Sequence, residues 1–252
     1  MTRPIALRID DIGASSKRYN YHARNRFLNV GILRHRRLFG AWAPYRETTP
    51  QEWQEVFSIL RRNRAKLTVG VTATWVEEDG SLTPFPEKFP EEAEVLREGA
   101  SEGLLEIANH GYTHCVLQDQ AYKPGYWAGN RSMHREFWDW LPAETHARHL
   151  TESQRILGAY FQTPPTTLVP PGNVFCQATV EAASRQGITH INCQVQPADE
   201  EAYAQTSGAI KILGNEHVVA FHDRELVLEG VSWLSDKLAS LADVEFCFVR
   251  EL

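Results

Sequence analysis

The sequence predicts an α/β domain in which strands and helices alternate, and three observations support this prediction. Short β-branched or apolar runs alternate with helical patterns along the whole chain, which is typical of a mainly parallel sheet. The 252 residues suit one large α/β domain of barrel size or two small domains, and no linker or repeat divides them. Four polar clusters each follow a predicted strand, where the functional residues of an α/β barrel gather. We therefore expect a single domain over residues 1–252.

Eight segments of the chain have the composition of strands. Each is a short run of β-branched or apolar residues, and helical patterns separate most of them. In chain order they cover residues 5–9, 67–71, 104–108, 167–169, 188–192, 210–213, 218–221 and 244–249.

The clearest helix is predicted to begin after Thr49. Thr49 and Glu52 form a capping box, and Pro50 takes the first helical position. Apolar residues then recur every three or four positions, at Trp53, Val56, Phe57 and Leu60. Two more stripes of this kind predict helices later in the chain, at Leu150, Ile156, Leu157 and Tyr160, and at Val231, Leu234, Leu238 and Leu241.

Two intervals, residues 12–49 and 116–141, are far longer than the usual connection between a strand and a helix. Loops of this length are usually functional. The second is rich in aromatic residues: Tyr122, Tyr126, Trp127, Phe137, Trp138 and Trp140. Aromatic rings pack on a scaffold more often than they stack on a flat ligand such as a sugar, and both interpretations remain open here. Tyr126 and Trp127 are the candidates for contact with a substrate.

The composition is that of a globular protein, with 42% hydrophobic and 23% charged residues. No apolar run approaches the roughly 18 residues that a membrane span requires. The N-terminal residues lack the layout of a signal peptide, so we expect a cytoplasmic protein with free thiols at its four cysteines.

The net charge of −6 is unevenly distributed. The first 66 residues hold 14 basic and 5 acidic residues, whereas the remainder holds 12 basic and 27 acidic ones. Most of the early arginines are expected to pair with the acidic remainder, and the alternative is attraction of an anionic substrate. An acidic chain is a poor partner for nucleic acid.

Two pairs of potential metal ligands follow predicted strands, Asp10 with Asp11 and His110 with His114. Adjacent aspartates at a buried strand end repel each other, and a divalent cation would compensate them. The alternative for the aspartates is a helix cap or a turn. Two histidines and one carboxylate suit Zn²⁺ and leave a fourth position for water, whose pKa falls to about 7. Gly111 follows the first histidine and disfavours the helical His-Glu-x-x-His arrangement, so we expect a loop.

In chain order, the polar clusters resemble the motifs of the polysaccharide deacetylases, the NodB-homology group of carbohydrate esterase family four. The clusters are Asp10-Asp11, His110-Gly-Tyr-Thr-His114, Pro170-Pro171-Gly172 and His222-Asp223. The resemblance spans residues 10–223 and implies a distorted (β/α) barrel of roughly seven strands.

The resemblance also implies roles for the residues that match. Asp10 would be the general base, Asp11, His110 and His114 the metal ligands, and His222 the general acid. The turn at Pro171, Gly172 and Asn173 is a candidate substrate contact.

Three positions depart from the family pattern. The family usually has an arginine before its Pro-Pro pair that tethers the base, and Val169 stands there. The acidic motif that orients the acid histidine has no clear counterpart, and Asp223 is the candidate substitute. Ala220 and Phe221 precede His222 where the family tends to place a leucine that shapes the acetyl pocket.

The resemblance implies a metal-dependent hydrolase that removes an N- or O-acetyl group from a sugar. The metal would be Zn²⁺ or another divalent transition metal such as Co²⁺ or Ni²⁺. A cytoplasmic location favours a nucleotide- or lipid-linked precursor of a surface polysaccharide such as lipopolysaccharide O-antigen, and the chain resembles the WbmS-like proteins of O-antigen loci. The alternatives are a non-catalytic carbohydrate-binding protein on the same fold and a metal-dependent phosphoesterase.

Overall fold

The computed structural model describes residues 2–19, 27, 33, 44–116, 135–194 and 210–252. Their main sheet is parallel throughout and curls into a half-barrel, which confirms the predicted distorted (β/α) barrel. The strand order is β10-β1-β2-β5-β6-β7-β8, with β9 also paired to β1. The strands are β1 (Arg3–Ile12), β2 (Leu67–Val71), β5 (Leu105–Asn109), β6 (Thr167–Leu168), β7 (His190–Asn192), β8 (Lys211–Leu213), β9 (Val218–His222) and β10 (Val244–Cys247).

Strands β9 and β10 share one edge of β1. β10 pairs with the first residues of β1, up to Ala6, and β9 pairs with the residues from Ala6 to Asp10. The two strands therefore occupy one position in the sheet, and the described part of the chain has seven strand positions, as predicted. This arrangement brings His222, the last residue of β9, opposite Asp10.

One hairpin was not predicted. It consists of β3 (Thr74–Val76) and β4 (Leu82–Pro84), which pair antiparallel beside the main sheet. All three residues of β3 are buried, so the segment lacks the alternation of polar and apolar residues by which an antiparallel strand is recognised.

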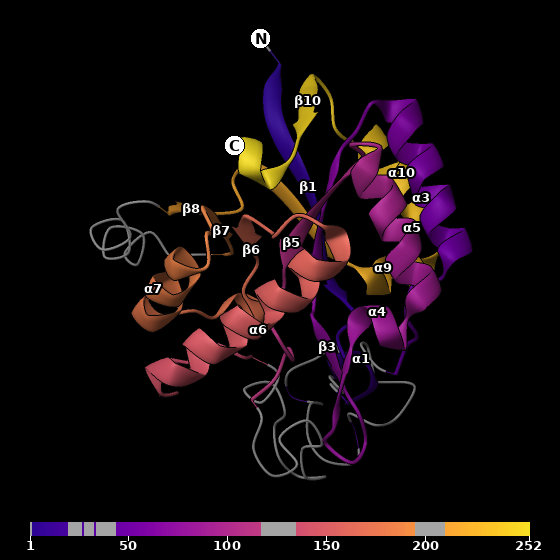
Figure 1. Cartoon of the computed structure of the whole chain (residues 1–252). Coiled ribbons are helices and arrows are strands. Elements are labelled where there is room, and N and C mark those ends of the chain that lie inside the picture. Colours follow the sequence, from indigo (N-terminus) through magenta and orange to yellow (C-terminus); the bar gives the residue numbers. More distant parts are fainter. Residues whose placement is uncertain (1, 20–26, 28–32, 34–43, 117–134, 195–209) are drawn as a thin grey trace.

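The helices cover the sheet on two sides (Figure 1). α3 (Pro50–Asn63), α5 (Pro90–Ser101) and α10 (Ser232–Ala239) lie together on one side, and α6 (Ala143–Phe161) and α7 (Gln177–Arg185) lie on the other. The short helices are α1 (Ser16–Tyr19), α4 (Phe85–Lys88) and α9 (Asp223–Glu229), and 3-10 turns cover Pro171–Asn173 and Val249–Glu251.

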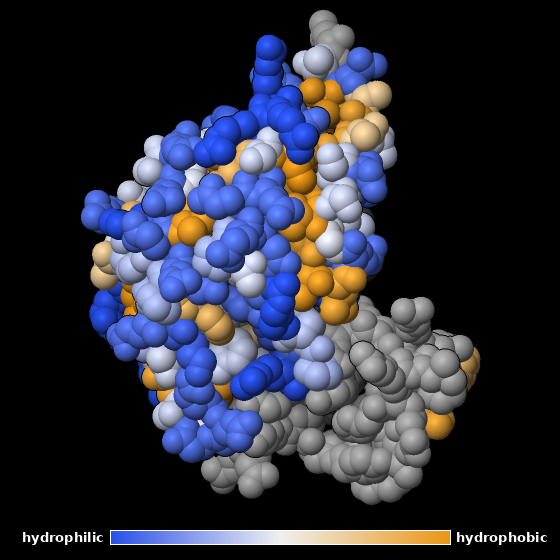
Figure 2. Space-filling view, turned by 90° about the vertical axis from the view of Figure 1, so that its right-hand side faces the viewer, coloured by the Kyte–Doolittle hydropathy of each residue, from blue (hydrophilic) through white to orange (hydrophobic). Residues whose placement is uncertain are grey.

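Helix α3 begins as its sequence predicts. The Thr49 hydroxyl accepts from the backbone N–H of Glu52, and the Glu52 carboxylate accepts from the backbone N–H of Thr49 at 2.9 Å. The predicted apolar face is buried, namely Trp53, Val56, Phe57 and Leu60. The outer surface on this side of the molecule is mostly hydrophilic, with a narrow apolar band (Figure 2).

Polar side chains occupy one face of the central strands. Arg8, Thr68 and Glu106 are in register across β1, β2 and β5, and all three are buried. Glu106 accepts hydrogen bonds from Thr68 at 2.7 Å and Thr167 at 2.5 Å. Because side chains alternate along a strand, Asp10 lies on the same face as Arg8, one step nearer the C-terminal end of β1.

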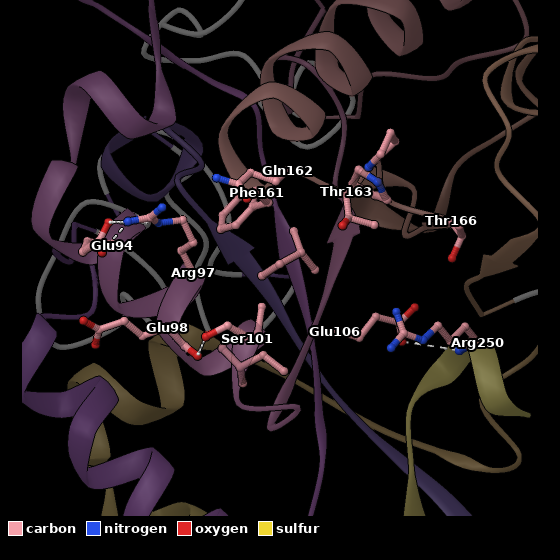
Figure 3. Close-up of a pocket in the computed structure, with 15 residues that line it drawn as sticks. Glu94, Arg97, Glu98, Ser101, Glu106, Phe161, Gln162, Thr163, Thr166 and Arg250 are labelled. Carbon is pink, nitrogen blue, oxygen red and sulfur yellow. Dashed lines mark hydrogen bonds and ion pairs between the residues drawn. The ribbon is translucent and has the colours of Figure 1, made fainter.

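A cavity of about 760 Å³ lies at the N-terminal ends of β5 and β6 (Figure 3). Phe161, Thr163, Glu98 and Arg250 are among the residues that line it, and Arg97 points toward Glu94 at its rim. None of the predicted site residues that the structure describes lines it, so the cavity is separate from the polar clusters.

Among the described residues, no helix combines the length and the apolar character needed to span a membrane. All four cysteines are described and are free thiols, as predicted.

Candidate metal centre

Three strand ends meet at the C-terminal edge of the sheet. Asp10 and Asp11 lie near the end of β1, His110 follows β5 directly, and His222 ends β9. Gly70 of β2 lies between the first two, and a Cβ placed on it would be 3.4 Å from both Asp10 Oδ1 and His110 Cβ. The absence of a side chain at Gly70 therefore lets the aspartate and the histidine approach each other.

Asp11, His110 and His114, the ligands that the resemblance implies, lie together in one cluster. Asp11 Oδ1 lies 3.3 Å from His110 Nε2 and 3.1 Å from His114 Nε2. The two imidazole rings are buried, with their centroids 4.9 Å apart. Asp11 and His114 both have positive φ, 71° and 57°, a strained conformation that concentrates at functional sites.

The donor atoms of this cluster fit a divalent cation. Ligand atoms at about 2.0–2.1 Å from a tetrahedral Zn²⁺ lie about 3.3 Å from one another, close to the distances between Asp11 and the two histidines. Both ring nitrogens of His114 are buried and have no hydrogen-bond partner of good geometry among the described residues. A metal would satisfy Nε2 of this ring.

His110 is held in the tautomer that a metal requires. Its Nδ1 lies 2.7 Å from the carbonyl oxygen of Val169, which can only accept a hydrogen bond, so Nδ1 carries the proton. The Nε2 lone pair then faces Asp11. A backbone carbonyl in this role orients many metal-binding histidines.

The charges in the cluster stabilise one another. Burial raises the pKa of Asp11, but its close contacts with His110 and His114 and the nearby charge of His222 lower it well below its usual range. The pKa of His110 is raised, because the bond to Asp11 and the charge of Asp10 outweigh the effect of burial. These surroundings thus favour the charged forms of Asp11 and His110.

Asp10 has a tether that sequence analysis missed. Arg8 donates from Nε to Oδ1 at 2.9 Å and from a terminal nitrogen to Oδ2 at 2.8 Å, which is a bidentate ion pair. Both residues are buried. The arginine thus comes from the same strand as the aspartate, not from the position of Val169. The signal was present, because residues two apart on a strand share a face.

Arg8 is itself fixed by β7, which is not adjacent to β1 in the strand order. Its other terminal nitrogen donates to the side chain of Asn192 and, at 3.2 Å, to the backbone carbonyl of Asn192. The Asn192 amide donates in turn to the carbonyl of Leu213 at 2.9 Å. A continuous chain of hydrogen bonds therefore runs from the end of β8 through β7 to Asp10.

His222 lies beside a different carboxylate from the one predicted. Glu225 Oε2 lies 3.8 Å from His222 Nδ1 and accepts from the His222 backbone N–H at 2.8 Å. Asp223 is completely buried and forms an ion pair with Lys17, and it accepts from the Tyr45 hydroxyl at 3.0 Å. Glu225 is therefore the better candidate for orienting His222.

A buried ionic cluster joins both ends of the first long interval to the start of α9. Lys17 binds Glu47 at 2.7 Å as well as Asp223, and Glu47 accepts from the backbone of Gly13 at 3.0 Å. Burial raises the pKa of Asp223, and the carboxylates of Glu47 and Asp11 raise it further, against the effect of Lys17. No sequence signal connects residues so far apart along the chain.

The predicted substrate contacts have different outcomes. The loop of residues 110–114, which carries both histidines, is called the ligand loop. Pro171, Gly172 and Asn173 form a turn beside it, since a Cβ on Gly111 would lie 3.0 Å from Pro171 Cγ. The Asn173 side chain accepts from the backbone of Gln194 at 3.0 Å. Tyr126 and Trp127 lie outside the described residues.

Close packing explains why a glycine follows His110. Gly111 has a φ of 85°, and a Cβ there would overlap the Glu136 carboxylate. Glu136 lies within the second long interval, residues 116–141, and is buried against the loop.

These features define a (β/α)-barrel protein with a candidate centre of two histidines and one aspartate. Residues 44–191 match the sequence profile of the polysaccharide deacetylases, more than half of the chain. The chain belongs to the polysaccharide deacetylase family. The match contains His110 and His114, whereas Asp10, Asp11 and His222 lie outside it.

Solved structures of carbohydrate esterase family 4 share the fold. A mutant of a Bacillus anthracis family 4 pseudoenzyme with restored activity is 13% identical, with a TM-score of 0.53. An acetyl xylan esterase from Clostridium thermocellum with a cobalt ion is 12% identical, with a TM-score of 0.50, and T48 deacetylase with substrate is 14% identical, with a TM-score of 0.51.

The likeness covers almost the whole chain. The alignments cover 100%, 99% and 99% of it, and 67%, 89% and 90% of the respective structures. The chain thus spans about two thirds of the pseudoenzyme's length. No curated protein sequence matches the chain. At these identities the structures establish the fold, and the chemistry has to be argued from the site.

We predict that Gly111→Ala destabilises the protein more than Gly103→Ala. Both glycines flank β5 and have positive φ, which costs alanine roughly 1–2 kcal/mol. A Cβ on Gly103 meets nothing within 4 Å, whereas one on Gly111 overlaps Glu136. Urea unfolding of both variants measures the difference. Equal free energies of unfolding would contradict the close packing of Glu136.

Proposed function

We propose that the protein is a zinc-dependent deacetylase that hydrolyses an N- or O-acetyl group of a sugar. The observation that carries this proposal is the position of Asp10. It lies beside the cluster of Asp11, His110 and His114 and is held there by Arg8 in a bidentate ion pair. A metal centre with an adjacent, oriented carboxylate is suited to hydrolysis by activated water.

Each residue in the proposed mechanism has a separate task. Asp11, His110 and His114 would hold the metal, which, when bound, supplies Lewis-acid polarisation of the acyl carbonyl and lowers the pKa of water. Asp10 takes the proton of the attacking water at its carboxylate. His222, opposite Asp10 on the neighbouring strand, gives a proton to the departing amine or alcohol.

The ligand set supports zinc as the metal. Two imidazoles and one carboxylate form a borderline donor set that suits Zn²⁺ and leaves a position open for chemistry. Co²⁺ and Ni²⁺ accept the same donors.

For the substrate, we propose a nucleotide- or lipid-linked precursor of a surface polysaccharide such as O-antigen. The basic excess of the first 66 residues supports an anionic substrate. The turn at Pro171, Gly172 and Asn173, beside the ligand loop, is the proposed sugar contact. The expectation of a cytoplasmic reaction and the resemblance to WbmS-like proteins belong to the same proposal.

The rival function is that of a carbohydrate-binding pseudoenzyme. It is worth testing because one structural relative is a family 4 pseudoenzyme. Acetate release from a panel of acetylated nucleotide sugars and acetylated oligosaccharides, with the zinc-loaded protein, separates the two. Acetate release supports the deacetylase. Sugar binding without acetate release supports the pseudoenzyme, and phosphate release would indicate a phosphoesterase.

We predict that the asparagine variants of the two adjacent aspartates fail in different ways. Asp11→Asn should weaken metal binding, because a neutral amide is a poorer ligand for a divalent cation than a carboxylate. Asp10→Asn should retain the metal and lose about 10²–10⁴-fold in turnover, the usual contribution of a general base. Elemental analysis and acetate release measure the two effects. Equal metal loss in both variants would mean that the roles are shared or reversed.

We predict that Arg8→Met lowers kcat by about 10²-fold and leaves KM nearly unchanged. Without the ion pair the Asp10 carboxylate is no longer held in its reactive position, and a small displacement of a reacting group is enough for a loss of this size. Arg8→Lys should retain part of the activity, since lysine keeps the charge but loses the two-point contact. In the Asp10→Asn background, Arg8→Met should cause little additional loss. A full additional loss there would mean that Arg8 acts on something other than Asp10.

A further inference from the structure

Glu136 binds three consecutive backbone amides of the ligand loop. Its Oε1 accepts from the N–H of Tyr112 at 2.8 Å, and its Oε2 accepts from Thr113 at 3.2 Å and from His114 at 2.9 Å. The carboxylate is 1% exposed, so water cannot take its place. Successive amides around one anion form a concave nest, which is usually a site for a ligand and here encloses a side chain of the same chain.

The other backbone groups of the loop have partners in the scaffold. The carbonyls of Gly111 and Tyr112 accept from Ala73 and Thr74, at 3.0 Å and 2.8 Å. The Gly111 N–H donates to the side chain of Asn109 at 2.9 Å. The next three amides rely on Glu136. Unpaired buried amides are costly, so without this carboxylate the loop would have to rearrange.

His149 is the side-chain partner of Glu136. Its Nδ1 lies 2.6 Å from Glu136 Oε1, and it is buried in helix α6 with its ring 5.4 Å from that of Tyr112. Burial raises the pKa of Glu136, but the charge and the hydrogen bond of His149, with the amides of Tyr112 and Thr113, lower it below its usual value. Helix α6 is thereby linked to the ligand loop.

We propose that Glu136, supported by His149, is a positioning residue of the metal centre and that it sets metal affinity. The loop must turn His114 into a left-handed conformation, with φ of 57°, to bring Nε2 to Asp11. The amide of His114 is fixed by Glu136, which offsets the strain of that conformation. The inference rests on the proposed metal site but not on the reaction it performs.

The experiment measures the Kd for Zn²⁺ and Co²⁺ by competition with a chromophoric chelator. Glu136→Gln preserves the shape but replaces one acceptor oxygen with a donor. Its Kd should rise about 10–100-fold, the usual effect of losing an outer-shell partner. Glu106→Gln is the matched control, because Glu106 is equally buried and also hydrogen-bonded, but lies on the N-terminal side of Asp10. Its Kd should remain that of the wild type.

A second variant covers the case in which Glu136→Gln does not fold. His149→Leu leaves the amide contacts of Glu136 intact but removes its side-chain hydrogen-bond partner, and it should raise the Kd in the same direction. Combined with Glu136→Gln, it should raise the Kd by less than the product of the two effects, because both act on one carboxylate.

Three outcomes separate this inference from the proposed function. A Kd within twofold of the wild type in Glu136→Gln or His149→Leu overturns the inference, as does an equal rise in Glu106→Gln. Weak metal binding in the variants, together with a wild type that binds metal but releases no acetate, supports the inference and removes the deacetylase. A wild type that binds no metal overturns both.

Discussion

Electrostatic compensation of buried carboxylates is the constraint on which the rest of the site depends. Asp10, Asp11 and Glu136 lie within one small region at the end of a parallel sheet, and all three are largely removed from water. A buried carboxylate without compensation would take up a proton or destabilise the fold. Each therefore has its own source of positive charge or its own amides. The architecture of the site is largely the set of these partners.

The partners of these three carboxylates come from different parts of the fold, so each carboxylate can be positioned independently of the others. Arg8 lies on the same strand as Asp10, whereas the histidines that face Asp11 follow another strand. Glu136 is compensated from a helix, through His149. Because each pair has its own support, loss of Arg8 should affect the orientation of Asp10, whereas loss of His149 should act on the metal ligands only through the geometry of the loop. A single shared cation could not give that independence.

Sequence analysis located the strands and the candidate metal ligands because both follow periodic or local rules. Parallel strands end at one edge, so residues that follow them converge, and His110 and His114 could be paired from their spacing. Arg8 could have been found by the same rule, because it shares a face of its strand with Asp10. Glu136 and His149 could not, since their pairing with the loop depends on tertiary packing across unrelated segments. The β3–β4 hairpin, which supports the same loop, was missed because its first strand is uniformly buried.

The position of the arginine bears most directly on function. Val169 stands where the family motif usually has the arginine that tethers the general base. Taken alone, this suggests that Asp10 has no tether and therefore favours a non-catalytic protein. A tether acts through the position of its charge, and Arg8 brings a guanidinium to both oxygens of Asp10 from within the same strand, β1. Val169 contributes its carbonyl instead, which orients His110. The valine that favours the pseudoenzyme interpretation is thus compensated by an arginine within β1, and this arrangement supports the proposed deacetylase.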